Sequence, residues 1–230
     1  MRKASLLLFC LSMFGQNAIR GFPPSAVAAE RELELRAKLL PDAGRIRSYM
    51  EKLAAKPHHA GSPGSKAVAD YILTQLKSWG LDARTEVFEA LLPYPGTRLL
   101  EMTSPVKFKA SLKEPAVAED KETADPTQLP TYNAYSASGD VTGPLVYVNY
   151  GVPEDYEFLR MQGVDVRGKI VIARYGKSWR GVKPKVAQEH GALACLIYSD
   201  PRDDGYYQGD AYPKGPMRPE NGAQRGSVVD

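Results

Sequence analysis

The stretch KIVIARYGKSWRGVKPKVAQEHGALACLIYS, residues 169–199, decides the fold class. Short runs rich in β-branched and aromatic residues at 169–175 and 192–199 are typical of strands. Between them, residues 183–191 have a proline near the start and a glycine at the end, as helices tend to have. A strand, a helix and a second strand in this order predict a unit of the α/β class.

The same alternation extends toward the N-terminus. PLVYVNY, residues 144–150, predicts another short strand, and PEDYEFLRMQG, residues 153–163, predicts a helix that begins at a proline and ends before a glycine. After residue 200 the chain becomes rich in Gly, Pro and Asp, and its acidic stretch lacks the carboxylate spacing of an EF-hand. We therefore expect an α/β fold of mixed α+β type, with an exposed acidic turn after the last strand.

Two helices are predicted earlier in the chain. Apolar side chains recur at helical spacing within residues 41–55, and Pro57 ends this helix because the residue before a proline is pushed out of helical geometry. Ser62 is a good N-cap for a second helix, Pro63 suits its first position, and Gly80 suits its end.

Strand-like runs follow the second helix. Residues 82–90, 98–103 and 106–113 each predict a strand, and the last alternates between apolar and polar side chains, as a half-exposed strand does. Residues 114–130 show no periodic pattern, so we interpret them as a linker and a domain boundary.

The first 28 residues have the layout of a secretory signal. A basic start precedes an apolar run at residues 4–15, and small residues follow, with cleavage expected after Ala28. The run is shorter than the ~20 residues that span a bilayer, so a membrane anchor is the weaker alternative. We expect a secreted or periplasmic protein.

The charge balance argues against nucleic-acid binding. Arg2, Lys3 and Arg20 lie in the signal, which contains no acid, so 27 of the 30 basic residues remain beside 27 acidic ones. A neutral chain has no bulk electrostatic attraction for nucleic acid. After cleavage only Cys195 remains, so no intrachain disulfide can form, and its apolar surroundings favour a buried, unreactive thiol.

Metal ligands are sparse. The chain has three histidines, the neighbouring His58 and His59 and the distant His190, and it contains neither an HExxH nor a CxxC motif. A catalytic zinc site needs about three protein ligands. We therefore interpret the histidine pair as a turn before a helix. The chain also lacks a GxSxG motif and a phosphate-binding GK[ST] loop.

A basic loop is the stronger candidate site. ARYGKSWRGVKPK, residues 173–185, follows a predicted strand and combines five basic residues with glycine, tyrosine and tryptophan. Ligands often bind where α/β strands end, and an arginine there can hold a carboxylate with two parallel hydrogen bonds. The alternative is a basic turn exposed to solvent.

Longer stretches resemble a known family. Residues 49–82 resemble the N-terminal segment of M28-type zinc peptidases. A second set resembles the protease-associated domain of the glutamate carboxypeptidase II subfamily, which includes N-acetylated-alpha-linked acidic dipeptidases and the non-enzymatic transferrin receptors. This set consists of GPLVYVNYG at 143–151, RGKIVIARYGKSWRG at 167–181, AQEHGALACLIYSDP at 187–201 and NGAQRGSVV at 221–229.

The resemblance implies an exported exopeptidase that uses two zinc ions, with a water between the metals attacking the last peptide bond. It places every zinc ligand and the catalytic glutamate after Asp230, so no catalytic or metal-binding residue is assigned here and this chain alone is expected to be inactive. Calcium is a possible further cofactor, and the full-length protein is a possible homodimer.

Two substrate-binding residues follow from the resemblance. Arg180 matches the arginine with which glutamate-selective members hold an acidic substrate carboxylate. Ser227 stands where the family pattern QRGN has a substrate-binding asparagine. A hydroxyl can still donate one hydrogen bond but reaches less far, which puts strict glutamate selectivity in doubt.

We therefore expect a signal at residues 1–28, the start of a peptidase domain at 29–115 and an incomplete protease-associated domain at 116–230. The full-length protein would release C-terminal, preferably acidic, residues from peptides. The alternative is a non-catalytic secreted binding module or a transferrin-receptor-like scaffold. Arg180 favours the enzyme, because capture of a carboxylate would have little use without catalysis.

Overall fold

The computed structural model describes residues 18–229, and the chain divides into two compact units, Met1–Ala55 and Lys56–Asp230. Most of the predicted secretory signal, residues 1–17, lies outside the described residues. Within residues 18–229 no helix is both long and apolar enough to cross a membrane.

The first unit is helical. A 3-10 turn, Pro24–Ala26, leads into α1 (Val27–Lys38), which contains the expected cleavage position Ala28 and is not among the predicted helices. The second helix, α2 (Ala43–Leu53), matches the prediction for this region, and the Asp42 carboxylate accepts a hydrogen bond from the Arg45 backbone at its start.

The second unit begins with the turn that contains the histidine pair. As predicted, this turn leads into α3 (Pro63–Ser78), the Ser62 Oγ accepts a hydrogen bond from the Ser65 N–H at 3.1 Å, and Gly80 has the positive φ of a helix end. A Cβ added to Gly64 would lie 2.2 Å from the Pro57 carbonyl oxygen, so the turn folds tightly against the helix.

The strand predicted at residues 82–90 is wrong. The backbone there is irregular, and the side chains of Val87 and Phe88 are 92% and 83% exposed. A β-rich sequence becomes a strand only beside a partner that pairs with its backbone, and no strand pairs with this segment within the described residues. The strands predicted at residues 98–103 and 106–113 are confirmed but are shorter than expected. They form β1 (Glu101–Met102) and β2 (Phe108–Lys109), which pair antiparallel.

Residues 114–130, which we interpreted as a linker, are folded. They contain a 3-10 turn, Lys121–Ala124, in which the Thr123 Oγ1 accepts a hydrogen bond from the Val117 N–H at 2.8 Å. Glu122 in this turn forms an ion pair of 2.9 Å with Lys56. These contacts connect the segment to the residues just before α3.

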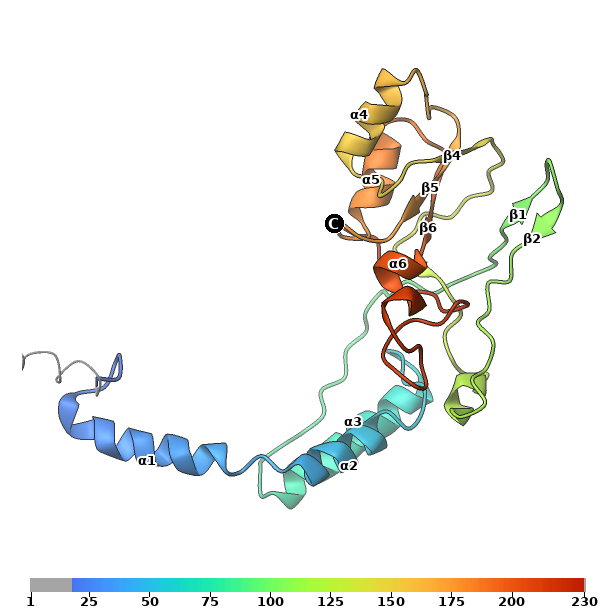
Figure 1. The fold of residues 1–230 in the computed structure, drawn as a ribbon. Helices are drawn as coiled ribbons and strands as arrows, with labels where there is room; N and C mark the ends of the chain where they lie inside the picture. The colour runs from blue at the N-terminus through green and yellow to red at the C-terminus, as the bar shows by residue number, and fades with distance from the viewer. Residues whose placement is uncertain (1–17, 230) are drawn as a thin grey trace, which may run out of the picture. The chain divides into compact units, whose positions relative to one another are not determined.

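The predicted α/β unit is confirmed. Three parallel strands lie in the order β4-β5-β6, and Figure 1 shows both connecting helices on the same side of them. Its elements are β4 (Leu145–Tyr147), α4 (Pro153–Met161), β5 (Ile170–Arg174), α5 (Val182–Glu189) and β6 (Ala194–Tyr198).

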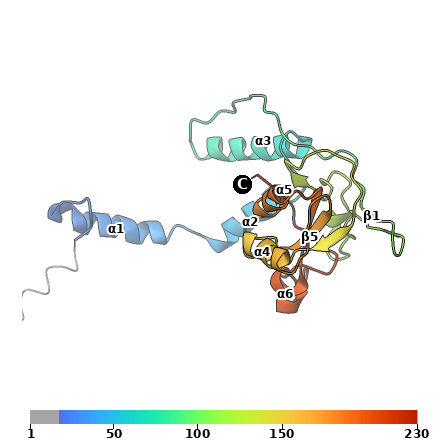
Figure 2. The same cartoon turned by 90° about the horizontal axis from the view of Figure 1, so that it is seen from above.

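The core lies between this sheet and its helices. Val171 and Ala173 of β5 are fully buried, and Tyr156 of α4 and Val186 of α5 pack in the same cluster. Figure 2 shows α4 and α5 beside β5 from a second direction. Because β5 is the middle strand, the segment that leaves its C-terminal end starts from the most firmly held part of the unit.

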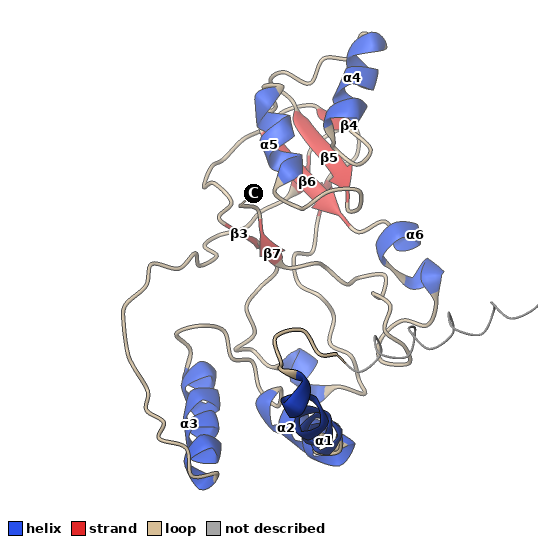
Figure 3. Cartoon of the chain, turned by 90° about the vertical axis from the view of Figure 1, so that its left-hand side faces the viewer, coloured by secondary structure: helices blue, strands red, loops and turns tan. Residues whose placement is uncertain are grey.

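Several short elements complete the unit. After β6 the chain forms α6 (Pro201–Asp204) and a 3-10 turn, Tyr206–Gln208. It then returns to pair β7 (Gly226–Ser227) in parallel with β3 (Asn133–Ala134), as Figure 3 shows.

Candidate functional site around Arg180

The basic loop lies at the C-terminal end of β5, between β5 and α5, as the sequence predicts. It turns sharply at Gly176 and Lys177, both of which have positive φ, and leads through Trp179 to Arg180. The Trp179 side chain is 85% exposed, whereas Arg180 is only partly exposed.

Neutral groups hold the guanidinium of Arg180. Its Nε donates to the Tyr175 hydroxyl at 3.1 Å, and its Nη2 donates to the Gln224 side-chain oxygen at 2.7 Å. Its central carbon also lies 5.4 Å from the centre of the Tyr175 ring. Neither neighbour neutralises the positive charge, so these contacts orient the guanidinium and leave its charge available.

The strand β7 approaches this guanidinium very closely. A Cβ added to Gly226 would lie 2.1 Å from the Arg180 Nη1, and a Cβ added to Gly181 would lie 2.6 Å from the Val228 carbonyl oxygen. The glycine of the QRGS segment therefore makes room for Arg180. The structure thus brings Arg180 beside a segment about 45 residues further along the chain.

Ser227 follows Gly226 in β7. It is exposed, and its Oγ accepts a hydrogen bond from the Val229 N–H at 3.1 Å. The structure therefore places both predicted substrate-binding residues in one region, with Arg180 oriented by side chains and Ser227 engaged with its own backbone.

Three other arginines of this unit are paired with carboxylates. Arg174 lies 3.1 Å from Asp203, Arg218 lies 3.1 Å from Asp204, and Arg225 forms an ion pair with Glu114. By contrast, no carboxylate among residues 18–229 lies within ion-pairing distance of Arg180. Unlike Arg174, Arg218 and Arg225, Arg180 therefore has no carboxylate partner in the part of the chain that the structure describes.

Asp204 contacts Gln224, the residue that binds Arg180. Its Oδ2 accepts hydrogen bonds from the Gln224 Nε2 at 2.7 Å, the Ser199 Oγ at 2.8 Å and the Arg218 Nε at 3.1 Å. Burial acts to raise the pKa of Asp204, but these donors together hold it below its usual value. The ionised carboxylate orients the Gln224 amide so that its oxygen faces Arg180.

Glu114 fixes the segment before β7. Its carboxylate accepts a hydrogen bond from the Ala223 N–H at 2.7 Å and pairs with Arg225. Burial acts to raise the pKa of Glu114, but these two contacts hold the pKa below its usual value. Beside these residues is a pocket of about 910 Å³ that lies between residues 112–131 and 203–225.

The remaining sequence candidates do not form a second site. His58 and His59 lie in the predicted turn, with the His58 Nδ1 2.8 Å from the Lys56 carbonyl oxygen, and His190 stacks on Tyr156. Burial raises the pKa of Cys195 to about 11, so its thiol is protonated at neutral pH. Among residues 18–229, no group of three or more His, Cys, Asp or Glu side chains could hold a metal ion.

Sequence reasoning missed the residues that hold Arg180. Gln224 lies 44 residues away, and its contact depends on the return of β7 to this side of the unit. Lys183, which the sequence groups with the basic loop, is fully buried rather than exposed to solvent. The resemblance to known proteins gave the only signal that connected the loop with residues 224–227.

Comparison with known proteins identifies the class of domain to which the Arg180 site belongs. Residues 141–227 match the family model of the PA domain, a range that includes the parallel sheet, the Arg180 loop and β7. It lies within the predicted 116–230, whose exact bounds remain a prediction.

Relatives then identify the family. The chain is 40% identical over 177 residues to the "Probable glutamate carboxypeptidase" of Arthroderma benhamiae, covering 74% of this chain and 24% of that protein. It is 34% identical over 199 residues to "Aminopeptidase NAALADL1" of Rattus norvegicus, covering 82% and 27%. The chain belongs to this glutamate carboxypeptidase-like family of PA-domain proteins, and it spans about a quarter of the length of the curated relatives it matches.

A solved structure was also matched. BSAP, a zinc aminopeptidase from Bacillus subtilis, is 22% identical with a TM-score of 0.43, over 69% of this chain and 33% of that one.

Proposed function

We propose that this chain supplies the substrate-carboxylate-binding part of an exported, zinc-dependent exopeptidase that releases C-terminal, preferably acidic, residues from peptides. The relatives' names support a peptidase. The proposal also rests on residues 1–28, which resemble a secretory signal, and on the match of Arg180 to the family's carboxylate-binding arginine.

The observation that carries the proposal is the set of contacts around the Arg180 guanidinium, which contains neutral hydrogen-bond partners and no carboxylate among the described residues. Hydrogen bonds from Arg180 to Tyr175 and Gln224 fix the guanidinium plane, while the Nη1 atom has no hydrogen-bond partner among the described residues. An oriented arginine without a carboxylate partner is suited to bind a carboxylate from outside, because charge-assisted bonds to guanidinium are strong and directional.

The described residues do not fit a zinc site, since no suitable group of ligands occurs between residues 18 and 229. In a zinc peptidase of this family the metal ions activate the attacking water. The role proposed for this chain is to bind the substrate: Arg180 holds a carboxylate, and the exposed Trp179 beside it offers an apolar surface to the neighbouring part of the peptide.

Binding of small peptides tests the proposal directly. We would titrate the 15N-labelled chain with the dipeptide Ala-Glu and with Ala-Gln amide, which has the same shape but no carboxylate. The chain has two tryptophans, so the Trp179 indole signal reports on the site and the Trp79 signal is an internal control. We expect Ala-Glu to shift the Trp179 signal and to bind at least about tenfold more tightly than the amide. Equal binding of the two peptides would contradict the proposal.

Ala-Gln, which keeps the terminal carboxylate and lacks the acidic side chain, tests the acidic preference separately. We expect Ala-Glu to bind more tightly than Ala-Gln, and equal binding of the two peptides would contradict the acidic preference.

A further inference from the structure

Lys183 is the second residue of α5 and has no exposed surface. Its ammonium group lies among neutral oxygens: Nζ is 2.5 Å from the Tyr150 carbonyl oxygen, 2.9 Å from the Gly176 carbonyl oxygen and 3.4 Å from the Ser178 Oγ. Burying a charge is costly unless hydrogen bonds compensate it. The three contacts therefore make a definite structural connection between α5, the end of β4 and the loop that carries Arg180.

The loop that Lys183 holds is conformationally strained. Lys177 has a φ of +59°, which is unfavourable for a residue with a side chain, and it lies between the two loop residues that Lys183 contacts. Gly176 has a φ of +116°, and a Cβ added to it would lie 2.8 Å from the Tyr150 ring. A turn of this kind persists only where its surroundings fix it, and Lys183 binds it on both sides of the strained residue.

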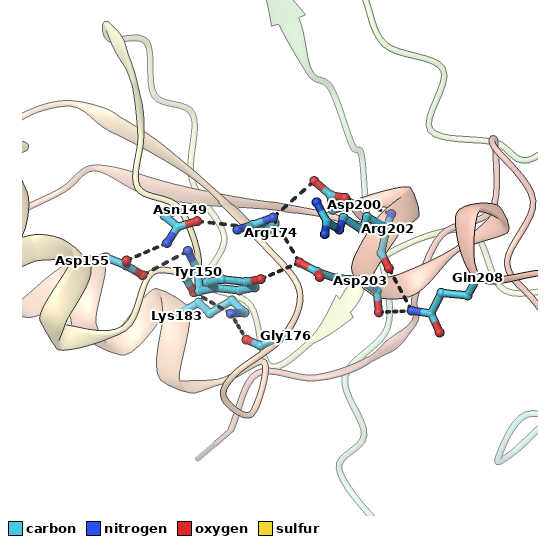
Figure 4. Close-up of polar contacts among 10 residues, drawn as sticks. All are labelled: Asn149, Tyr150, Asp155, Arg174, Gly176, Lys183, Asp200, Arg202, Asp203 and Gln208. Atoms are coloured by element: carbon cyan, nitrogen blue, oxygen red, sulfur yellow. Dashed lines mark hydrogen bonds and ion pairs between the residues drawn. The ribbon is translucent and has the colours of Figure 1, made fainter.

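The other partner of Lys183 is itself held firmly. Figure 4 shows Tyr150 between the loop and α6, with its hydroxyl donating to Asp203 at 2.7 Å. The Arg174 guanidinium lies 4.0 Å from the centre of the Tyr150 ring, and Asp155 accepts from the Tyr150 backbone N–H at 3.0 Å. Because Tyr150 is fixed in three directions, the Lys183 contact transmits that rigidity to Gly176 and Ser178.

We propose that Lys183 is a positioning residue, which sets the Gly176–Ser178 turn so that Arg180 is already oriented for a substrate carboxylate. This inference rests on the proposed function of Arg180. Lys183 is fully buried and cannot touch a ligand, so any effect it has on binding must pass through the loop. Its charge lies in the interior, where burial also lowers the pKa of its amine.

Replacement of Lys183 by methionine tests the inference, because methionine keeps the length of the side chain and loses its donors. We expect Lys183→Met to weaken Ala-Glu binding about tenfold or more, and to leave the weak binding of Ala-Gln amide within twofold of wild type. Lys214→Met is the matched control. It removes the same charge from an exposed position of the same unit, outside the Arg180 loop, and we expect less than threefold loss.

Ser178→Ala provides a second, milder variant in case Lys183→Met does not fold. It removes only the longest of the three Lys183 contacts and should weaken Ala-Glu binding about two- to threefold. Lys183→Gln, which keeps an amide donor, should bind Ala-Glu better than Lys183→Met. This partial rescue would not follow from a loss of charge alone.

The outcomes separate this inference from the proposed function. If wild type prefers Ala-Glu and Arg180→Gln loses that preference, but folded Lys183→Met and Ser178→Ala bind as wild type does, then only the positioning role is wrong. An equal loss for Ala-Glu and Ala-Gln amide would also overturn it, because that pattern indicates general damage to the site. If wild type shows no preference for Ala-Glu, the proposed function itself fails.

Discussion

At the scale of single residues, Arg180 and Lys183 are close in sequence but have different environments. Both lie in one run of cations after a strand, and composition alone assigns them the same solvated environment. The structure separates them: Lys183 is buried against backbone oxygens, and Arg180 is held by the side chains of Tyr175 and Gln224. The two residues differ because their partners Tyr150 and Gln224 lie 33 and 44 residues away in the sequence, and a local sequence pattern carries no information about such contacts.

Gly226 gives the first residue-scale prediction. A Cβ at this position would lie 2.1 Å from the Arg180 Nη1, so Gly226→Ala must displace the guanidinium. We expect the variant to bind Ala-Glu about tenfold more weakly, because a misplaced arginine loses its paired hydrogen bonds, and to unfold within a few degrees of wild type. Gly139→Ala is the control, since nothing lies within 4 Å of an added Cβ there. Wild-type affinity in Gly226→Ala would show that the close approach is unimportant.

At the scale of elements, the sequence predicted those whose signals are local. The α/β unit was predictable because each strand and helix has its own run and its own end residues, and α3 because Ser62, Pro63 and Gly80 mark its ends. The prediction of a strand at residues 82–90 was wrong because a strand needs a neighbouring strand to pair with, and sequence periodicity does not identify that neighbour.

The N-cap of α3 gives a prediction at this scale. Ser62→Ala removes the oxygen that accepts from the Ser65 N–H and should lower the free energy of unfolding by about 1 kcal/mol in urea denaturation. Ser62→Asp, which restores an acceptor, should recover most of that loss. If Ser62→Ala is as stable as wild type, the cap contributes nothing and the packing around Gly64 alone fixes the start of the helix.

At the scale of the whole second unit, carboxylates connect segments that are far apart in sequence. Glu114 binds Ala223, 109 residues away, and Asp204 joins Ser199, Arg218 and Gln224. The unit's connections depend on the ionised forms of these two acids, whose pKa values are lower in the folded protein than usual. Residues 114–130, whose sequence resembles a linker, are held by contacts of the same kind, from Glu114 to Ala223 and from Glu122 to Lys56.

These lowered pKa values fix the sign of the pH dependence. The folded protein binds protons at Glu114 and Asp204 less tightly than the unfolded chain does, so their contribution to stability is present above their ordinary pKa of about 4 and is lost as the pH falls through the lower folded values. The melting temperature should therefore fall between pH 5 and pH 3, and it should fall less steeply in Glu114→Gln. Identical slopes in wild type and variant would rule out a role for Glu114.

The most direct test of the central claim is a thermodynamic cycle on Arg180. The dissociation constants of Ala-Glu and Ala-Gln amide would be measured for wild type and for Arg180→Gln, with the Trp79 signal as the internal control. If Arg180 holds the substrate carboxylate, the substitution should remove a preference of at least about tenfold and leave the amide unaffected. If the substitution weakens both peptides equally, or neither, Arg180 does not bind a carboxylate.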